Sequence, residues 1–305
     1  MLILPYRADV ELRRLPFLTV LVCFVCIFVF ARQLWSEHEY RSALHSFCDQ
    51  RLSRNERIVA TYLQDEDRHF CAVMLDIRKA AEPQTAIRTL AETSKPVPFY
   101  RNRSDGIDYI YTTLLDSWRR FERTVPRNLT DDLSYDPGTF DIGRMVTAAF
   151  THADTFHLIS NLVFFFAFAA AVEVIVGYSY YFFFLLLTAI GTHLAYAYSV
   201  QGAANALPTV GLSGEVMAMM TFLAVVAPSL RIRCFFWLLI IFRTFRVPIS
   251  LIAALYVAEN VYDYANVDAD DHVNYMAHIS GAAIGALAGL IYRFTNREYL
   301  ERLMA

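Results

Sequence analysis

The stretch "FHLISNLVFFFAFAAAVEVIVG" (residues 156–177) is apolar for most of its length and long enough to cross a bilayer, which takes about 20 helical residues. Two polar residues near its start, His157 and Asn161, are four positions apart and so lie on one face of a helix. A polar face is costly against hydrocarbon and therefore points into a helix bundle or toward water. The stretch predicts a membrane protein with a polar site between its helices.

The rest of the chain extends this prediction to a whole bundle. Apolar residues make up 56% of the 305 residues, more than is usual for a soluble domain. Five further runs qualify as spans, the shorter ones because a bilayer adapts to them: 15–35, 180–198, 211–228, 247–261 and 275–292. The run 234–242 is too short to cross, and we expect it to lie at the membrane interface. The predicted fold class is an all-α polytopic membrane protein with a six-transmembrane-helix bundle.

The arginines indicate the orientation, because cytoplasmic loops carry an excess of Lys and Arg. They precede the first run, separate the fourth from the fifth, and follow the sixth: Arg7, Arg13, Arg14, Arg231, Arg233, Arg243, Arg246, Arg293, Arg297 and Arg302. The opposite loops, 199–210 and 262–274, contain no Lys or Arg, and the second is acidic. We therefore expect cytoplasmic tails at 1–14 and 294–305, in a bacterial inner (plasma) membrane.

Residues 36–142 are then expected to form an enlarged extracytoplasmic first loop. The helical apolar spacing of residues 107–125 predicts a small helical domain there. Cys48 and Cys71 would meet an oxidising environment, in which a disulfide and two free thiols are both open. The run 15–35 is interpreted as an uncleaved anchor, since no small-residue cleavage site follows it; a signal peptide is the alternative.

The predicted orientation puts four polar side chains at one depth. The second, fourth and sixth runs all begin on the outer face, and their first turns carry His157, Asn161, Ser213 and His278. A serine hydroxyl becomes a nucleophile when a general base takes its proton, and a neutral imidazole is the usual base near pH 7. We expect Ser213 and His278 to form such a pair.

Attack on a carbonyl develops an oxyanion, which needs preorganised hydrogen-bond donors. The two polar side chains of the second run could supply them, together with the backbone at Gly211 and Leu212. Small residues that recur every fourth position let helix backbones approach closely. Gly281 and Gly285 have this spacing on the sixth run, and Gly214 offers a matching small face on the fourth.

Each of these residues also has a structural interpretation. A lone serine in a membrane helix often bonds the carbonyl four residues before it, and a lone histidine often serves packing. Glu173 is expected to be a structural hydrogen-bonding residue, and His193 and His272 to be structural or solvated. The convergence of polar groups at one depth favours a catalytic site.

Three motifs, in order along the chain, resemble the signatures of the rhomboid intramembrane serine proteases. They are His157-x-x-x-Asn161, Gly211-Leu212-Ser213-Gly214, and Ala277-His278 followed by Gly281. The stretch 157–173 is also similar to the second span of that family, and His152 before it fits. The similarity covers about half the chain, and we expect the rhomboid core with helices two to six at residues 143–293.

The resemblance implies a serine endopeptidase that cleaves transmembrane proteins near the outer membrane face through an acyl-enzyme. Ser213 would be the nucleophile and His278 the base and then the acid, with His157 and Asn161 at the oxyanion. The family uses a Ser/His dyad with no third acidic member, and no metal or cofactor. The partners it implies are transmembrane protein substrates and the lipid bilayer, with no nucleic acid, and the oligomeric state stays open.

Structural support is expected from Gly214, Gly281, Gly285, Arg144, Glu173 and His152. The family commonly has Trp-Arg where this chain has Gly143-Arg144, and often an aromatic residue where it has Met217. A rhomboid-like protein that binds or escorts membrane clients is the alternative, although such proteins typically lack the serine or the histidine. A transporter would show paired repeats, and the sequence has none.

Overall fold

The computed structural model describes residues 2–9, 15–63, 69–80, 82–202, 206–238, 241–266 and 273–304. The chain divides into two compact units, with unit 1 formed by Met1–Gln33 and Thr130–Ala305 and unit 2 by Leu34–Leu129. Arg13 and Arg14 of the predicted N-terminal tail lie outside the described residues, as do residues 267–272 of the acidic loop, which include His272.

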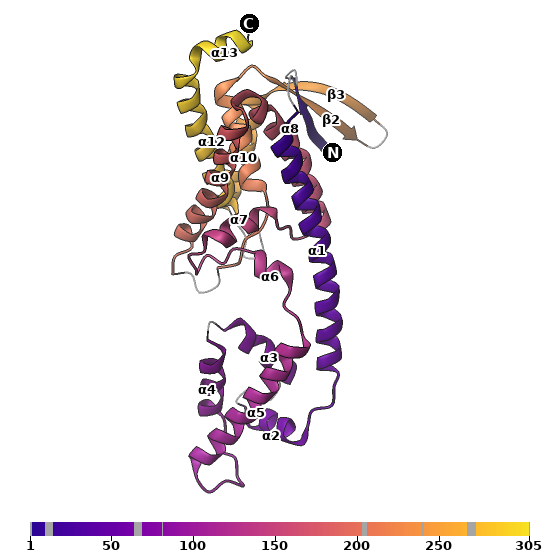
Figure 1. The fold of residues 1–305 in the computed structure, drawn as a ribbon, viewed down its shortest axis with the longest axis vertical. Helices are drawn as coiled ribbons and strands as arrows, with labels where there is room; N and C mark the ends of the chain where they lie inside the picture. Colours follow the sequence, from indigo (N-terminus) through magenta and orange to yellow (C-terminus); the bar gives the residue numbers. More distant parts are fainter. Residues whose placement is uncertain are drawn as a thin grey trace. The chain divides into compact units, whose positions relative to one another are not determined.

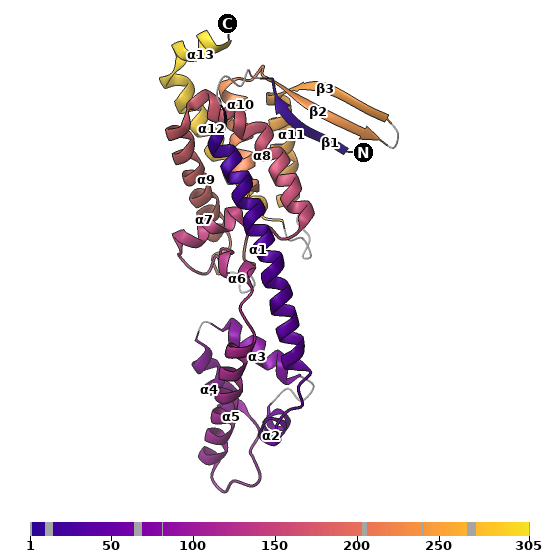
Figure 2. The same cartoon turned by 45° about the vertical axis from the view of Figure 1, so that its right-hand side comes forward.

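Unit 1 is a helix bundle (Figures 1 and 2). Its helices are α1 (Phe17–Cys48, as far as Gln33), α6 (Leu129–Leu133), α7 (Ile142–Phe150), α8 (Thr155–Val176), α9 (Tyr178–Ser199), α10 (Ser213–Val226), α11 (Ile249–Ala265), α12 (Tyr275–Thr295) and α13 (Arg297–Met304). Among the described residues, four helices are long and apolar enough to cross a membrane: α1, α8, α9 and α12. α10 is apolar but has 14 residues, and α11 has 17. The predicted count of six transmembrane helices is therefore not confirmed.

α10 lies in the interior of the bundle, where a short helix is tolerated. It packs against α8, α9, α11 and α12, as Figure 2 shows. Every residue from Gly214 to Leu223 is buried. A helix surrounded by protein need not match the thickness of the bilayer, since no lipid has to cover its ends. Ser213, its first residue, consequently sits between helices.

The beginning of α1 is held by a buried carboxylate of α8. Glu173 accepts hydrogen bonds from the backbone N–H groups of Leu18 at 2.8 Å and Thr19 at 2.7 Å, and from the Thr19 hydroxyl at 2.6 Å. The first N–H groups of a helix have no partner within the helix and carry a partial positive charge, so a carboxylate satisfies both needs. Glu173 is thus a structural contact between α1 and α8, as the sequence predicted.

Gln33 ties α1 to the bundle at the boundary of unit 1. Its amide nitrogen donates to the His152 carbonyl at 3.0 Å and to the Thr130 hydroxyl at 2.9 Å, and its carbonyl oxygen accepts from the His152 N–H at 3.1 Å. The chain leaves unit 1 after Gln33 and returns to it at Thr130. Both ends of the segment that forms unit 2 therefore meet at one side chain.

Unit 1 also contains an antiparallel sheet, so the structure is mostly helical, as predicted, but not purely α-helical. Its strand order is β1 (Leu2–Ala8), β2 (Arg231–Leu238), β3 (Ile241–Pro248). Ile232 and Cys234 are buried, whereas Arg231 before them is exposed and Arg233 between them is half-buried, which is the two-residue period of a strand. The run 234–242 is consequently divided between two strands, and α11 begins only at Ile249.

Unit 2 is a small helical domain around its own core. Its helices are the end of α1, α2 (Arg54–Tyr62), α3 (Phe70–Lys79), α4 (Pro83–Thr93) and α5 (Arg103–Thr124). α5 buries Ile110, Leu114 and Phe121 on one face, in agreement with the apolar spacing of its sequence. A disulfide joins Cys48 to Cys71, whose Cα atoms are 5.4 Å apart. The structure therefore decides the question that the sequence left open in favour of the disulfide.

Candidate active site

Ser213 and His278 lie side by side at the starts of α10 and α12. The Ser213 Oγ is 2.7 Å from the His278 Nε2, within hydrogen-bond distance. The start of α12 is fixed by Asn274, whose side-chain oxygen accepts the Ala277 N–H at 3.0 Å. The Asn274 amide nitrogen also donates to the Thr209 hydroxyl at 3.0 Å, which links α12 to the loop before the serine.

Glycines bring the two helices into backbone contact at this point. A Cβ on Gly281 would overlap the carbonyl oxygen of Gly214, and a Cβ on Gly285 would overlap that of Ala218. The Thr221 hydroxyl adds a bond of 2.9 Å to the Ala282 carbonyl across the same seam. Small residues at this spacing permit close approach, so the distance between hydroxyl and imidazole is set by the packing of α10 on α12.

Gly211 leaves room beside the serine for two polar side chains of α8. Its φ of +116° belongs to the region that favours glycine. A Cβ here would lie 2.8 Å from the His157 Nε2 and 3.5 Å from the Asn161 Nδ2. The Gly211 N–H donates to the Ala148 carbonyl at 2.9 Å. The hydrogen of this N–H is therefore already used, and what Gly211 contributes beside the serine is space.

Both α8 side chains present a nitrogen donor to this space. Asn161 is 7% exposed, and its amide nitrogen has no hydrogen-bond partner among the described residues. The His157 Nδ1 faces the Ala153 N–H at 3.4 Å, which assigns the proton of a neutral ring to Nε2 on the side of Gly211. Asp154 fixes the start of α8 by accepting the His157 N–H at 2.8 Å.

The supporting residues named from the sequence lie at different distances from this centre. His152 packs edge-on against His157, with ring centroids 5.3 Å apart. Burial, together with the neighbouring His157, lowers the pKa of His152 to about 4, so its ring is neutral at neutral pH. Arg144 on α7 instead faces Asp141, with 3.9 Å between the Nε and the carboxylate. Leu212 is buried and precedes the first turn of α10.

Asn260 of α11 completes the site and was missed in the sequence. Its side-chain oxygen is 2.6 Å from the His278 Nδ1. One feature of the sequence could have indicated its role, namely an amide within an apolar helix, because a polar side chain there usually faces another helix. Tyr275 is a further neighbour, with its ring edge-on to that of His278 and 6.3 Å between the ring centroids. This ring is an aromatic neighbour of the histidine from α12, not from the position of Met217.

The arrangement has the parts that acyl transfer requires. A hydroxyl faces an imidazole nitrogen, the other imidazole nitrogen faces an acceptor, and two N–H donors point to the space beside the hydroxyl. The nucleophile, its base and the candidate oxyanion donors come from three different helices. Their geometry therefore depends on helix packing and not on one loop.

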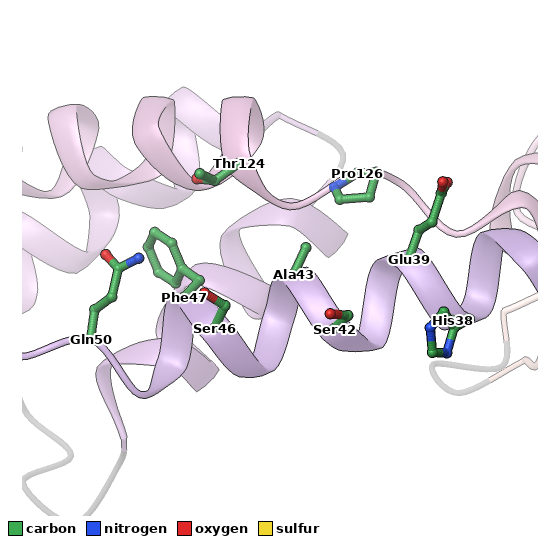
Figure 3. A pocket seen from close by; sticks show the side chains of 9 residues that line it. All are labelled: His38, Glu39, Ser42, Ala43, Ser46, Phe47, Gln50, Thr124 and Pro126. Atoms are coloured by element: carbon green, nitrogen blue, oxygen red, sulfur yellow. The ribbon is translucent and has the colours of Figure 1, made fainter.

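Unit 2 has an open groove of its own, about 610 Å³ in volume (Figure 3). The end of α1 lines it with His38, Ser42 and Ser46, and Thr124 and Pro126 line the other side. Within the described part of unit 2, no hydrogen bond joins the His38 ring to either serine. Figure 3 shows the ring below α1, whereas Phe47 rises toward Thr124. The groove does not reproduce the hydroxyl–imidazole pair of unit 1.

Comparison with known proteins bears on unit 1. A family model described as the rhomboid domain matches residues 139–294, about half of the chain. The match begins just before α7 and ends within α12, so it contains the serine, the histidine and both α8 donors. The comparison with curated proteins found no match.

Proposed function

Because this chain belongs to the rhomboid family, we propose that it is an intramembrane serine endopeptidase that cleaves transmembrane proteins near the outer membrane face. The observation that carries the proposal is the 2.7 Å between the Ser213 Oγ and the His278 Nε2, inside a bundle of apolar helices. The family match gives the class of protein, and this pair gives the chemistry.

In the first half of the reaction, Ser213 attacks the carbonyl carbon of the scissile peptide bond. The His278 Nε2 takes the hydroxyl proton as the Oγ–carbon bond forms, and then gives it to the leaving amine. The carbonyl oxygen becomes an oxyanion, to which the Asn161 amide and the His157 Nε2 would donate; their position beside Gly211 supports this role. The product of this half-reaction is an ester between Ser213 and the substrate.

In the second half, water replaces the amine. His278 takes a proton from the water, which attacks the ester carbon, and returns a proton to the Ser213 oxygen as it leaves. The donors used for the first oxyanion serve again, since the charge develops on the same oxygen. The chain's own side chains supply every proton transfer in this cycle.

We further propose the membrane arrangement predicted from the sequence. Six transmembrane helices, with α10 and α11 as the two short ones, would place Ser213 near the outer face and both termini in the cytoplasm of a bacterial cell. A substrate helix would enter the bundle from the side and unwind at small or helix-weakening residues. Unit 2 would then lie outside the cytoplasm, where its disulfide is stable.

Cleavage of a model transmembrane substrate in proteoliposomes tests the function. Ser213→Ala and His278→Ala should each lower the rate by about 10³-fold or more. Ser280→Ala is the matched control, because its hydroxyl bonds the Ala277 carbonyl of its own helix at 3.1 Å. A fluorophosphonate should label the wild type and the control but not Ser213→Ala.

Two outcomes would overturn the proposal. One is a wild type that neither cleaves nor reacts with the fluorophosphonate. The other is equal labelling of wild type and Ser213→Ala, which would place the reactive group elsewhere. A wild type that binds the substrate and leaves it intact, with the same affinity in all variants, would identify a client-binding protein.

A further inference from the structure

We propose that Asn260 is a positioning residue of the proteolytic site, holding the His278 imidazole in the one tautomer and orientation that can accept the Ser213 proton. The inference rests on the proposed serine protease function and adds to it a third member, an amide where many serine proteases have a carboxylate. The motifs of the sequence indicated only a serine and a histidine.

The orientation of the Asn260 amide is fixed by its second contact. Its Nδ2 lies 2.8 Å from the backbone carbonyl of Tyr256, one turn earlier in α11. A carbonyl oxygen accepts hydrogen bonds only, so the amide nitrogen must face it. The flipped amide would set two carbonyl oxygens against each other. The Oδ1 therefore faces the His278 Nδ1, at 2.6 Å.

This orientation decides which nitrogen of His278 carries the proton. An amide oxygen accepts but cannot donate, so the Nδ1 facing it must be the N–H of the neutral ring. The Nε2 is then left with a free lone pair, 2.7 Å from the Ser213 Oγ. A continuous relay of donors and acceptors runs from Ser213 through His278 and Asn260 to the Tyr256 carbonyl. The direction of each hydrogen bond in this series fixes which atom donates and which accepts in the next one.

The placement of Asn260 within α11 fits a role at the site. The buried residues of α11 are Ile249, Ile252, Ala253 and Asn260, so the amide is the one buried polar side chain of this helix. Its neighbour Glu259 is exposed. A buried amide in an apolar helix is costly unless it is hydrogen-bonded, and both of the bonds described above are needed to satisfy it. A neutral acceptor also avoids burying a second charge beside the imidazole.

A matched pair of variants in one helix tests the inference. Asn260→Leu removes the acceptor while keeping the branched shape and the number of heavy atoms of the side chain. Asn266→Leu makes the same change at the residue that follows α11, where the exposed amide donates to the Tyr262 carbonyl at 2.7 Å and to no other group among the described residues. Proteoliposomes with a model transmembrane substrate give kcat and KM, and thermal unfolding gives the folded fraction.

We expect Asn260→Leu to lower kcat by about 100-fold or more, because an imidazole without its orienting partner can take the wrong tautomer. KM should change by less than about threefold, since the contact acts on the base and not on substrate binding. Asn266→Leu should match the wild type in both constants. Asn260→Asp, which keeps an acceptor, should recover much of the lost kcat and move the acidic limb of the kcat/KM–pH profile to higher pH.

Several results would overturn the inference. The clearest is a folded Asn260→Leu with wild-type kcat. Another is an Asn260→Asp profile that coincides with that of the wild type, which keeps the test decisive even if Asn260→Leu fails to fold. A loss of activity that exactly follows the loss of folded protein would assign Asn260 to helix packing. In each case an active wild type leaves the proposed function standing, whereas an inactive wild type refutes that function first.

Discussion

The contact between α10 and α12 makes Gly281→Ala the most informative single perturbation of the site. The added Cβ would overlap the Gly214 carbonyl oxygen and lie 3.0 Å from the carbonyl carbon, where ordinary van der Waals contact begins at 3.4 Å. Relieving the overlap requires the helices to separate by roughly 1 Å, a displacement that can cost about 100-fold in rate when it reaches reacting groups. Gly214 follows the serine directly, and Gly281 is one turn after His278.

We therefore expect Gly281→Ala to cleave about 100-fold more slowly than the wild type and to lose about 1–3 kcal/mol of stability through overpacking. Gly289→Ala is the internal control on the same face of α12. Its Cβ would lie 3.1 Å from the Phe222 carbonyl oxygen and from the Val225 Cβ, so its neighbours need to move by only a few tenths of an ångström. Its effect on cleavage should be several times smaller.

The assay combines fluorophosphonate labelling rates with thermal unfolding of the same preparations. Labelling reports the serine and its base without a contribution from substrate access, and unfolding separates displacement from loss of the fold. Gly281→Ala with wild-type labelling and wild-type stability would refute the reasoning, because the helices could then not be in backbone contact at the serine. Equal damage in Gly281→Ala and Gly289→Ala would also contradict it.

Two further predictions concern unit 2. Burial acts to raise the pKa of Glu56, but hydrogen bonds from Ser53 and Ser117 and the charge of Arg120 outweigh it and lower the pKa below its usual value. The ionised carboxylate therefore stabilises unit 2 fully above the ordinary carboxyl pKa, and this stabilisation is lost as the pH falls through the lowered pKa. Acid unfolding followed by near-UV circular dichroism should show less destabilisation in Glu56→Gln than in the wild type. The disulfide closes a segment with a sequence separation of 23. The double variant Cys48→Ser and Cys71→Ser should therefore lower the free energy of unfolding of unit 2 by about 3 kcal/mol. Urea unfolding measures this loss, and an unchanged midpoint would contradict it.

Some residues of the candidate site could be predicted from the sequence and others could not. His157, Asn161, Ser213 and His278 could be found because each is polar at the start of an apolar run, a pattern that depends only on local spacing. The partner of the histidine could not be found in this way. One amide within α11 does not reveal which helix it faces, and its role emerges only when α11 packs beside α12.

The sheet was not predicted from the sequence, for a related reason. β1 pairs with β2, which begins more than two hundred residues later in the chain, and no local period shows which strand a short alternating segment will join. The Gly211 N–H is a smaller case of the same kind. The backbone at Gly211 was expected among the oxyanion donors, and the sequence does not show that its N–H bonds the Ala148 carbonyl of α7.

The hydrogen bond between Gln33 and Thr130 joins the two points at which the chain leaves and re-enters unit 1, which has a consequence for the engineering of this protein. Unit 2 is inserted between two points that one amide side chain holds together, so a short linker from Gln33 to Thr130 would close unit 1 without stretching it. The same junction could accept a foreign domain of any size whose termini are adjacent. Unit 2 is in this sense an insertion within the chain of unit 1.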